Sequence, residues 1–219
     1  MLNLSPYKTV KEWTKPYSDC PVHRVRPKTY SIIELPGGKL AFRKQDSCTR
    51  LLRHEAAILR RLAPLKCVPT VLFEEQDAIV QKYIPGQLLS EVLTSLGRFS
   101  RIVIVMQMVA ILCKVHCRSV VHGDVRLWNF IVSDYRRIVL FDFEYAYSLK
   151  KLGAIEQLPD EVVQHYQGRL MTRLQEWIEC CEAIKTLLSS DWLLLPFYGF
   201  AYASREILLR VHWRRRVIA

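Results

Sequence analysis

Short runs of apolar residues alternate with polar turns in the first part of the chain. Residues 29–35 and 39–44 have the composition of β-strands and flank the turn Pro-Gly-Gly, a combination that is typical of a β-hairpin. Residues 68–73 and 78–83 are two further strand-like runs around the polar turn Glu-Glu-Gln-Asp. Together these runs predict a small sheet within residues 23–85.

Apolar residues recur at helical spacing in other segments. In residues 50–62, the apolar positions 51, 52, 58, 59 and 62 have the period of an amphipathic helix. Residues 100–117 predict a longer apolar helix, and residues 159–189 predict a helix that is broken or weakened at Gly168. The pattern also predicts a basic helix over residues 204–217.

The stretch before the first hairpin is less regular. Residues 1–22 mix proline, lysine, tyrosine and tryptophan without a period, and we expect an irregular segment that lies on the surface. A strand near residues 22–26 would then precede the hairpin. The connection that follows it, Arg26-Pro27-Lys28, contains no glycine.

A second hairpin carries most of the candidate chemistry. Residues 130–132 and 138–141 predict two strands, with Asn129 directly before the first and Asp142 directly after the second. We therefore expect Asn129 and Asp142 to converge on one point, together with Asp124, which lies five residues before Asn129. Phosphoryl transfer needs such a set: one carboxylate faces the acceptor hydroxyl, while Asn and Asp oxygens hold Mg²⁺ against the ATP phosphates.

The segment from His122 to Tyr145 resembles the catalytic loop and metal-binding triplet of the protein-kinase-like superfamily, His-x-Asp-x-x-x-x-Asn followed by Asp-Phe-Gly. Gly123 replaces the usual arginine and Glu144 replaces the glycine, as in choline, ethanolamine and aminoglycoside kinases. The compact length is instead similar to that of lipopolysaccharide-core kinases. The resemblance implies an α+β fold with a small β-rich N-lobe, a reduced helical C-lobe, and ATP and Mg²⁺ as cofactors.

The resemblance also implies roles for individual residues of this segment. Asp124 would be the base, or would align the acceptor hydroxyl, and His122 would orient the loop through hydrogen bonds. Asn129 and Asp142 would be the Mg²⁺ ligands. Glu144 would either assist a second metal ion through water or form a salt bridge, and both alternatives stay open.

In the N-lobe, the third strand is expected to carry a cation that contacts the α- and β-phosphates. The sequence Leu-Ala-Phe-Arg-Lys allows two registers, because side chains on a strand alternate between faces. Arg43 with Ala41 is the preferred register because it resembles choline kinases, and Lys44 with Phe42 is the alternative. Glu55, the single acid of the helix that follows, is expected to pair with the cation.

A strand that runs into Tyr-Ile-Pro-Gly-x-Leu resembles the hinge between the lobes of small-molecule kinases. The hinge puts the boundary near residue 85, with the N-lobe at 23–85 and the C-lobe at 86–219. The backbone groups expected to bond to adenine belong to Lys82, Tyr83 and Ile84.

Composition narrows the class of protein. The 219-residue chain is 50% hydrophobic, enough for the core of one domain or a two-lobed unit. The net charge of +11 favours anionic partners, but no nucleic-acid-binding motif is present. The longest apolar runs, 102–112 and 192–203, are shorter than the ~20 residues of a membrane span, and we expect no signal peptide. Seven cysteines without a CxxC pair indicate buried free thiols in a reducing, cytoplasmic compartment.

The sequence leaves the acceptor open. The departures at Gly123 and Glu144 favour a small molecule, sugar or headgroup over a protein serine or threonine. The competing interpretation is a pseudokinase, a binding module without turnover, which the absent glycine loop favours and the intact Asp124, Asn129 and Asp142 oppose. A weaker alternative is a basic scaffold for anionic partners. The candidate contacts with an anionic substrate or membrane surface are Arg205, Arg210, Arg214, Arg215 and Arg216.

Overall fold

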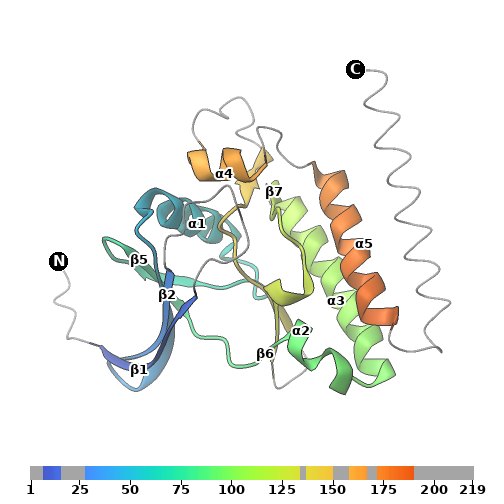
Figure 1. The fold of residues 1–219 in the computed structure, drawn as a ribbon, viewed down its shortest axis with the longest axis horizontal. Coiled ribbons are helices and arrows are strands. Elements are labelled where there is room, and N and C mark those ends of the chain that lie inside the picture. The colour runs from blue at the N-terminus through green and yellow to red at the C-terminus, as the bar shows by residue number, and fades with distance from the viewer. Residues whose placement is uncertain (1–6, 16–27, 134–136, 150–157, 167–171, 190–219) are drawn as a thin grey trace. The chain divides into compact units, whose positions relative to one another are not determined.

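The computed structural model of the chain describes residues 7–15, 28–133, 137–149, 158–166 and 172–189. The chain divides into two compact units, Met1–Ile84 and Pro85–Ala219 (Figure 1). The predicted strand near residues 22–26 lies outside the described residues, as do the basic helix predicted over residues 204–217 and its arginines.

The first unit is built on one five-stranded antiparallel sheet. The strand order from edge to edge is β1-β2-β3-β5-β4 (Figure 1). The strands are β1 Lys8–Lys15, β2 Lys28–Leu35, β3 Lys39–Gln45, β4 Val71–Glu74 and β5 Ala78–Lys82. Strands β2 and β3 confirm the predicted hairpin. Gly37 and Gly38 of its turn both have a positive φ, a conformation that glycine adopts without a steric penalty.

Strand β1 corrects the expectation of an irregular segment over residues 1–22. Lys8–Lys15 pair with β2 from one end to the other, with Lys8 opposite Glu34 and Lys15 opposite Lys28. The strand lies at the edge of the sheet, and residues 8–14 are exposed. Because no buried positions alternate with exposed ones, its sequence lacks the period of two by which half-buried strands are predicted.

Helix α1 (Thr49–Leu62) covers one face of this sheet at β4 and β5. Leu52 and Ala56 of the helix pack against Ile79 of β5. The neighbouring residue Val80 points to the opposite face, because side chains alternate along a strand. The core cluster on that opposite face consists of Ile33, Ala41 and Val80.

The second unit combines helices with two small antiparallel sheets, of strand order β6-β8-β9 and β10-β7. The strands are β6 Gln87–Leu88, β7 Val120–Val121, β8 Phe130–Val132, β9 Ile138–Leu140 and β10 Tyr147–Ser148. The helices are α2 Leu89–Val92, α3 Arg98–Cys117, α4 Asp160–His165 and α5 Arg173–Ser189. Short 3-10 turns lie at Leu93–Ser95 and Leu127–Asn129. The second hairpin and the long apolar helix are confirmed, and the helix predicted over residues 159–189 is divided into α4 and α5.

Helices α3 and α5 pack side by side in antiparallel directions (Figure 1). At one end, Arg101 Nη1 donates a hydrogen bond to Leu187 O at 3.2 Å. At the other end, Arg173 Nη2 donates to His116 O at 2.9 Å. These two contacts fix which residues of α5 face the segment that follows α3.

Helix α3 is apolar well beyond its buried side. By length and composition it could cross a membrane, although core helices of soluble proteins meet the same criterion. Phe99 and Met106 are 73% and 66% exposed. Cys113 and Cys117 also lie on the exposed side of α3, which corrects the expectation that they are buried, while all cysteines that the structure describes are free thiols.

Candidate functional site

The β8–β9 hairpin brings the expected pair of residues to one end. Phe130 pairs with Leu140 in the ladder, and Phe141 N donates to Asn129 O at 3.0 Å. Asn129 therefore lies beside the segment that leads into Asp142. The predicted convergence follows from this register.

His122 connects the two halves of this segment. Its ring is fully buried and lies edge-on to Phe143, with 4.5 Å between the ring centroids. His122 Nε2 lies 2.8 Å from Phe141 O, and Asp124 N donates to His122 Nδ1 at 3.2 Å. Because a carbonyl can only accept, these bonds require a neutral ring with its proton on Nε2. The loop-orienting hydrogen bonds expected of His122 are present.

The carboxylate of Asp124 is held from two sides. Asn129 Nδ2 donates both to Asp124 O and to Asp124 Oδ2, each at 2.8 Å. Arg126 Nε lies 2.8 Å from Asp124 Oδ1. The Asp124 side chain is still 24% exposed, so the carboxylate is oriented and accessible at once.

Asp142 has a strained backbone. Its φ is +63°, and in the described part of the chain Ser119 is the other non-glycine residue with a positive φ. Such a conformation costs of order 1 kcal/mol and tends to occur at functional sites. The next two residues, Phe143 and Glu144, are buried, which keeps the triplet in place.

The structure explains why glycine stands at position 123. Gly123 has a φ of +86°, and a Cβ on it would overlap the hydroxyl of Tyr166. Tyr166 donates from that hydroxyl to Tyr145 O at 3.0 Å. The arginine that the superfamily usually carries here would not fit without a shift of Tyr166.

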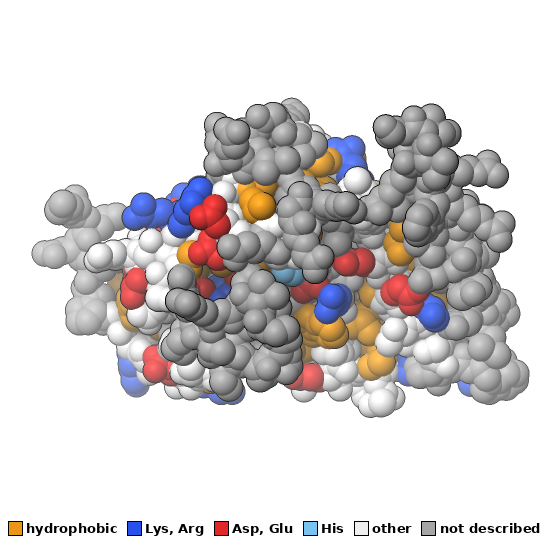
Figure 2. Space-filling model, turned by 45° about the horizontal axis from the view of Figure 1, so that its top comes forward, with side chains coloured by type: hydrophobic (Ala, Val, Ile, Leu, Met, Phe, Trp, Pro, Cys, Tyr) orange, Lys and Arg blue, Asp and Glu red, His pale blue; other side chains and the backbone are white. Residues whose placement is uncertain are grey.

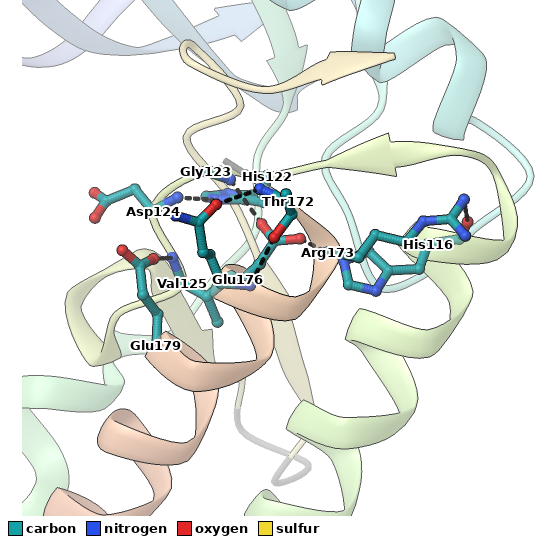
Figure 3. A network of polar contacts seen from close by, with 10 residues as sticks. His116, His122, Gly123, Asp124, Val125, Thr172, Arg173, Glu176 and Glu179 are labelled. Atoms are coloured by element: carbon teal, nitrogen blue, oxygen red, sulfur yellow. Dashed lines mark hydrogen bonds and ion pairs between the residues drawn. The ribbon is translucent and has the colours of Figure 1, made fainter. Parts of the chain in front are cut away.

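Two acids of α5 contact the loop, and neither was among the predicted site residues (Figure 3). Glu176 is fully buried; its Oε1 accepts a hydrogen bond from Gly123 N at 2.7 Å, and its Oε2 lies 2.5 Å from His116 Nε2. Glu179 Oε2 accepts a longer bond from Val125 N at 3.4 Å. The sequence signal is weak, because acids three residues apart on an amphipathic helix usually face solvent.

The environment of Glu179 changes its ionisation. Burial, and then the charge of the Asp124 carboxylate, raise the pKa of Glu179 to about 7. The Val125 N–H and the Arg126 guanidinium act in the opposite direction and lower this pKa. Glu179 is therefore a second titratable carboxyl group near Asp124.

In the first unit, Glu55 pairs with Lys44 and not with Arg43. Lys44 Nζ lies 2.8 Å from Glu55 Oε2, and both side chains are buried. Arg43 Nε instead lies 2.8 Å from Glu75 Oε2 on the other face of the sheet. The preferred register was wrong because α1 covers the face of Lys44, which alternation along β3 alone cannot reveal.

The predicted hinge residues follow β5. Lys82 is the last residue of that strand, and its N–H donates to Thr70 O at 2.8 Å. Tyr83 and Ile84 are half-buried and end the first unit. Adenine binding by their backbone groups stays a prediction.

The comparisons with known proteins agree with this fold and site. A family model for the RIO domain matches residues 36–168, more than half of the chain. The chain is thus a protein-kinase-like domain of the atypical kind. It belongs to the RIO domain family, and this membership implies an ATP-binding, kinase-like phosphotransferase. No curated protein matches the chain significantly.

Proposed function

We propose that the chain transfers the γ-phosphoryl group of ATP to a hydroxyl acceptor in a Mg²⁺-dependent reaction. The observation that carries this proposal is the bonding of Asp124, Asn129 and the start of the triplet into one arrangement. Asn129 Nδ2 is committed to Asp124, and Asn129 O accepts from Phe141 N. Asp124, Asn129 and Asp142 then belong to one oriented set.

The donor set suits Mg²⁺. Because Asn129 Nδ2 donates to Asp124, the amide oxygen Oδ1 is left as the atom that could ligate a cation. Asp142 adds carboxylate oxygens, and Mg²⁺ takes oxygen ligands. When bound, Mg²⁺ would neutralise charge that develops on the ATP phosphates. Glu144 would assist a second ion or form a salt bridge.

Within the first unit, Lys44 would contact the α- and β-phosphates. Its pairing with Glu55 at 2.8 Å holds the ammonium group in one position. Backbone groups of Lys82, Tyr83 and Ile84 would contact adenine. Phosphoryl transfer depends mostly on such positioning and on charge neutralisation.

Asp124 would face the acceptor hydroxyl. As the hydroxyl oxygen forms a bond to the γ-phosphorus, the bond from that phosphorus to the β-phosphate oxygen breaks and ADP leaves. The proton of the hydroxyl passes to Asp124. The bonds from Asn129 Nδ2 and Arg126 Nε hold the carboxylate in the required orientation.

The acceptor that we favour is a small molecule, a sugar or a lipid headgroup. The support is the pair of departures at Gly123 and Glu144, which are similar to the small-molecule kinases. A protein serine or threonine is the alternative. The free thiols of the described cysteines support a reducing, cytoplasmic location.

Label transfer from γ-labelled ATP tests the function. Wild type, Asp124→Ala and Asp142→Ala are incubated with Mg²⁺ and a panel of protein, sugar and headgroup acceptors. We expect each substitution to lower turnover at least about a hundredfold. Glu91→Ala, which removes an exposed acid of the same unit, is the control and should keep full turnover. The labelled fraction then names the acceptor class.

A pseudokinase is the second candidate, favoured by the absence of glycine in Arg26-Pro27-Lys28. A non-catalytic module would bind ATP without needing metal. Thermal unfolding with ATP alone and with ATP·Mg²⁺ separates the two cases: an equal shift together with an unlabelled acceptor panel would favour the pseudokinase.

The basic-scaffold interpretation has less support. Its arginine cluster lies outside the described residues. On the face drawn in Figure 2, acidic and basic side chains of the described residues are interspersed. A scaffold would bind anionic partners in a salt-sensitive way that does not depend on Asp142.

A further inference from the structure

Three aromatic rings lie on the face of the first sheet that carries Lys44. Trp13 of β1 lies opposite Tyr30 of β2, and Tyr30 lies opposite Lys44 of β3. Residues directly opposite each other in a sheet point to the same face. Phe42 precedes Lys44 by two positions on β3 and therefore shares this face as well.

The rings form a compact cluster. Their centroids are 6.0 Å apart for Trp13 and Tyr30, 5.9 Å for Tyr30 and Phe42, and 6.1 Å for Trp13 and Phe42. These separations are those of aromatic rings in contact. Trp13 is 39% exposed, and the other two rings are half-buried. The aromatic cluster of Trp13, Tyr30 and Phe42 thus has an accessible surface.

The position of the cluster limits what it can bind. Helix α1 packs on the same face at β4 and β5, while the rings lie on β1, β2 and β3. Lys44 separates the two regions, because Tyr30 and Ile79 are its neighbours on either side. Lys11 Nζ also lies 5.7 Å from the centre of the Trp13 ring. The surface is aromatic in the middle and cationic at its border.

We propose that this aromatic cluster binds the base of the nucleotide by stacking, beside the phosphates at Lys44. This inference rests on the proposed function, because it takes Lys44 as the phosphate contact. Phe42 and Lys44 are about 7 Å apart along the strand. A single ligand that spans them needs a planar group and an anion separated by a short linker, which describes a nucleoside triphosphate with its ribose.

Phe42 then determines how the base is held. The alternative register would put the small side chain of Ala41 at this position, but Ala41 is fully buried in the cluster with Ile33 and Val80 on the opposite face. A phenyl ring offers a stacking surface that a methyl group lacks. The rings would therefore supply affinity for the base, and Lys44 would supply affinity for the phosphates.

Equilibrium binding of ATP and of inorganic tripolyphosphate, both with Mg²⁺, tests the division of labour. Trp13→Leu and Phe42→Leu should raise the Kd for ATP about tenfold and leave the Kd for tripolyphosphate within about twofold of wild type. Trp13→Phe keeps a ring and should bind ATP almost as wild type does. Leu40→Ala is the matched control, because Leu40 lies on the same strand and face and is 42% exposed.

The outcomes separate this inference from the proposed function. An unchanged or lower Kd for ATP in both folded leucine variants overturns the stacking. So does a wild type that binds tripolyphosphate as tightly as ATP, although the phosphate site then stands. A wild type that binds neither probe removes the proposed function and the stacking with it. Circular dichroism checks each fold, and Trp13 on the exposed edge strand gives a variant with little risk of unfolding.

Discussion

Glu176 of α5 and Gly123 of the loop are joined by a hydrogen bond of 2.7 Å between Oε1 and the backbone N–H. The carboxylate is fully buried, and its second oxygen lies 2.5 Å from His116 Nε2 at the end of α3. One side chain therefore links two helices to the residue before Asp124 (Figure 3). The geometry of the loop depends on an acid 53 residues away in the sequence.

Glu176→Ala should destabilise the protein and lower turnover together. The change leaves the buried His116 ring and the Gly123 N–H without their acceptor, which costs about 3 kcal/mol. Urea unfolding measures the loss. Glu182→Ala removes a half-exposed acid of the same helix and should cost less than about 1 kcal/mol. Equal stabilities for the two variants would contradict this account of Glu176.

Gly123→Ala should be poorly tolerated for two separable reasons. The positive φ costs an alanine about 1 kcal/mol, and its Cβ overlaps the Tyr166 hydroxyl. Removing that hydroxyl in Tyr166→Phe should relieve part of the second cost. Thermal unfolding of both single variants and the double variant measures the coupling, and strictly additive losses would show that the overlap does not matter.

The stability of the protein should depend on Glu179 between about pH 5 and 7. Its pKa rises from 4.5 in the unfolded chain to about 7 in the folded protein. The folded state then binds more protons in this window, so this carboxyl's contribution to stability is present below pH 4.5 and is lost as pH rises through 7. Glu179→Gln should match wild type near pH 5 and exceed its stability near pH 8. Denaturant unfolding across this range, with Glu182→Gln as control, measures the difference.

Lys44→Met should weaken ATP binding strongly, whereas Arg43→Met should leave the Kd within about twofold. Lys44 shares the α1 face with Glu55, and Arg43 contacts Glu75 on the other face. Because Lys44→Met leaves Glu55 buried without its partner, it should also lose about 3 kcal/mol of stability. A Glu55→Gln change in the same chain should restore part of the stability and none of the affinity. Loss of ATP binding in Arg43→Met alone would return the assignment to Arg43.

Local patterns predicted most elements because the signals were local. Alternation and helical spacing identified the two hairpins, α1 and α3, and the Asn129-to-Asp142 span followed from hairpin geometry. Strand β1 escaped prediction because its side chains are exposed on an edge. It becomes a strand by pairing with β2, and backbone pairing leaves no trace in a sequence of this kind.

By itself the sequence determined the protein-kinase-like class and the spacing of Asp124, Asn129 and Asp142, since short spans of chain can reach only a few arrangements. The tertiary structure decided the rest. It chose Lys44 over Arg43 by laying α1 on one face of the sheet, and it brought Glu176 to Gly123 across 53 residues. Both outcomes depend on which surfaces pack together, and a strand or helix pattern shows that a face is buried without naming its partner.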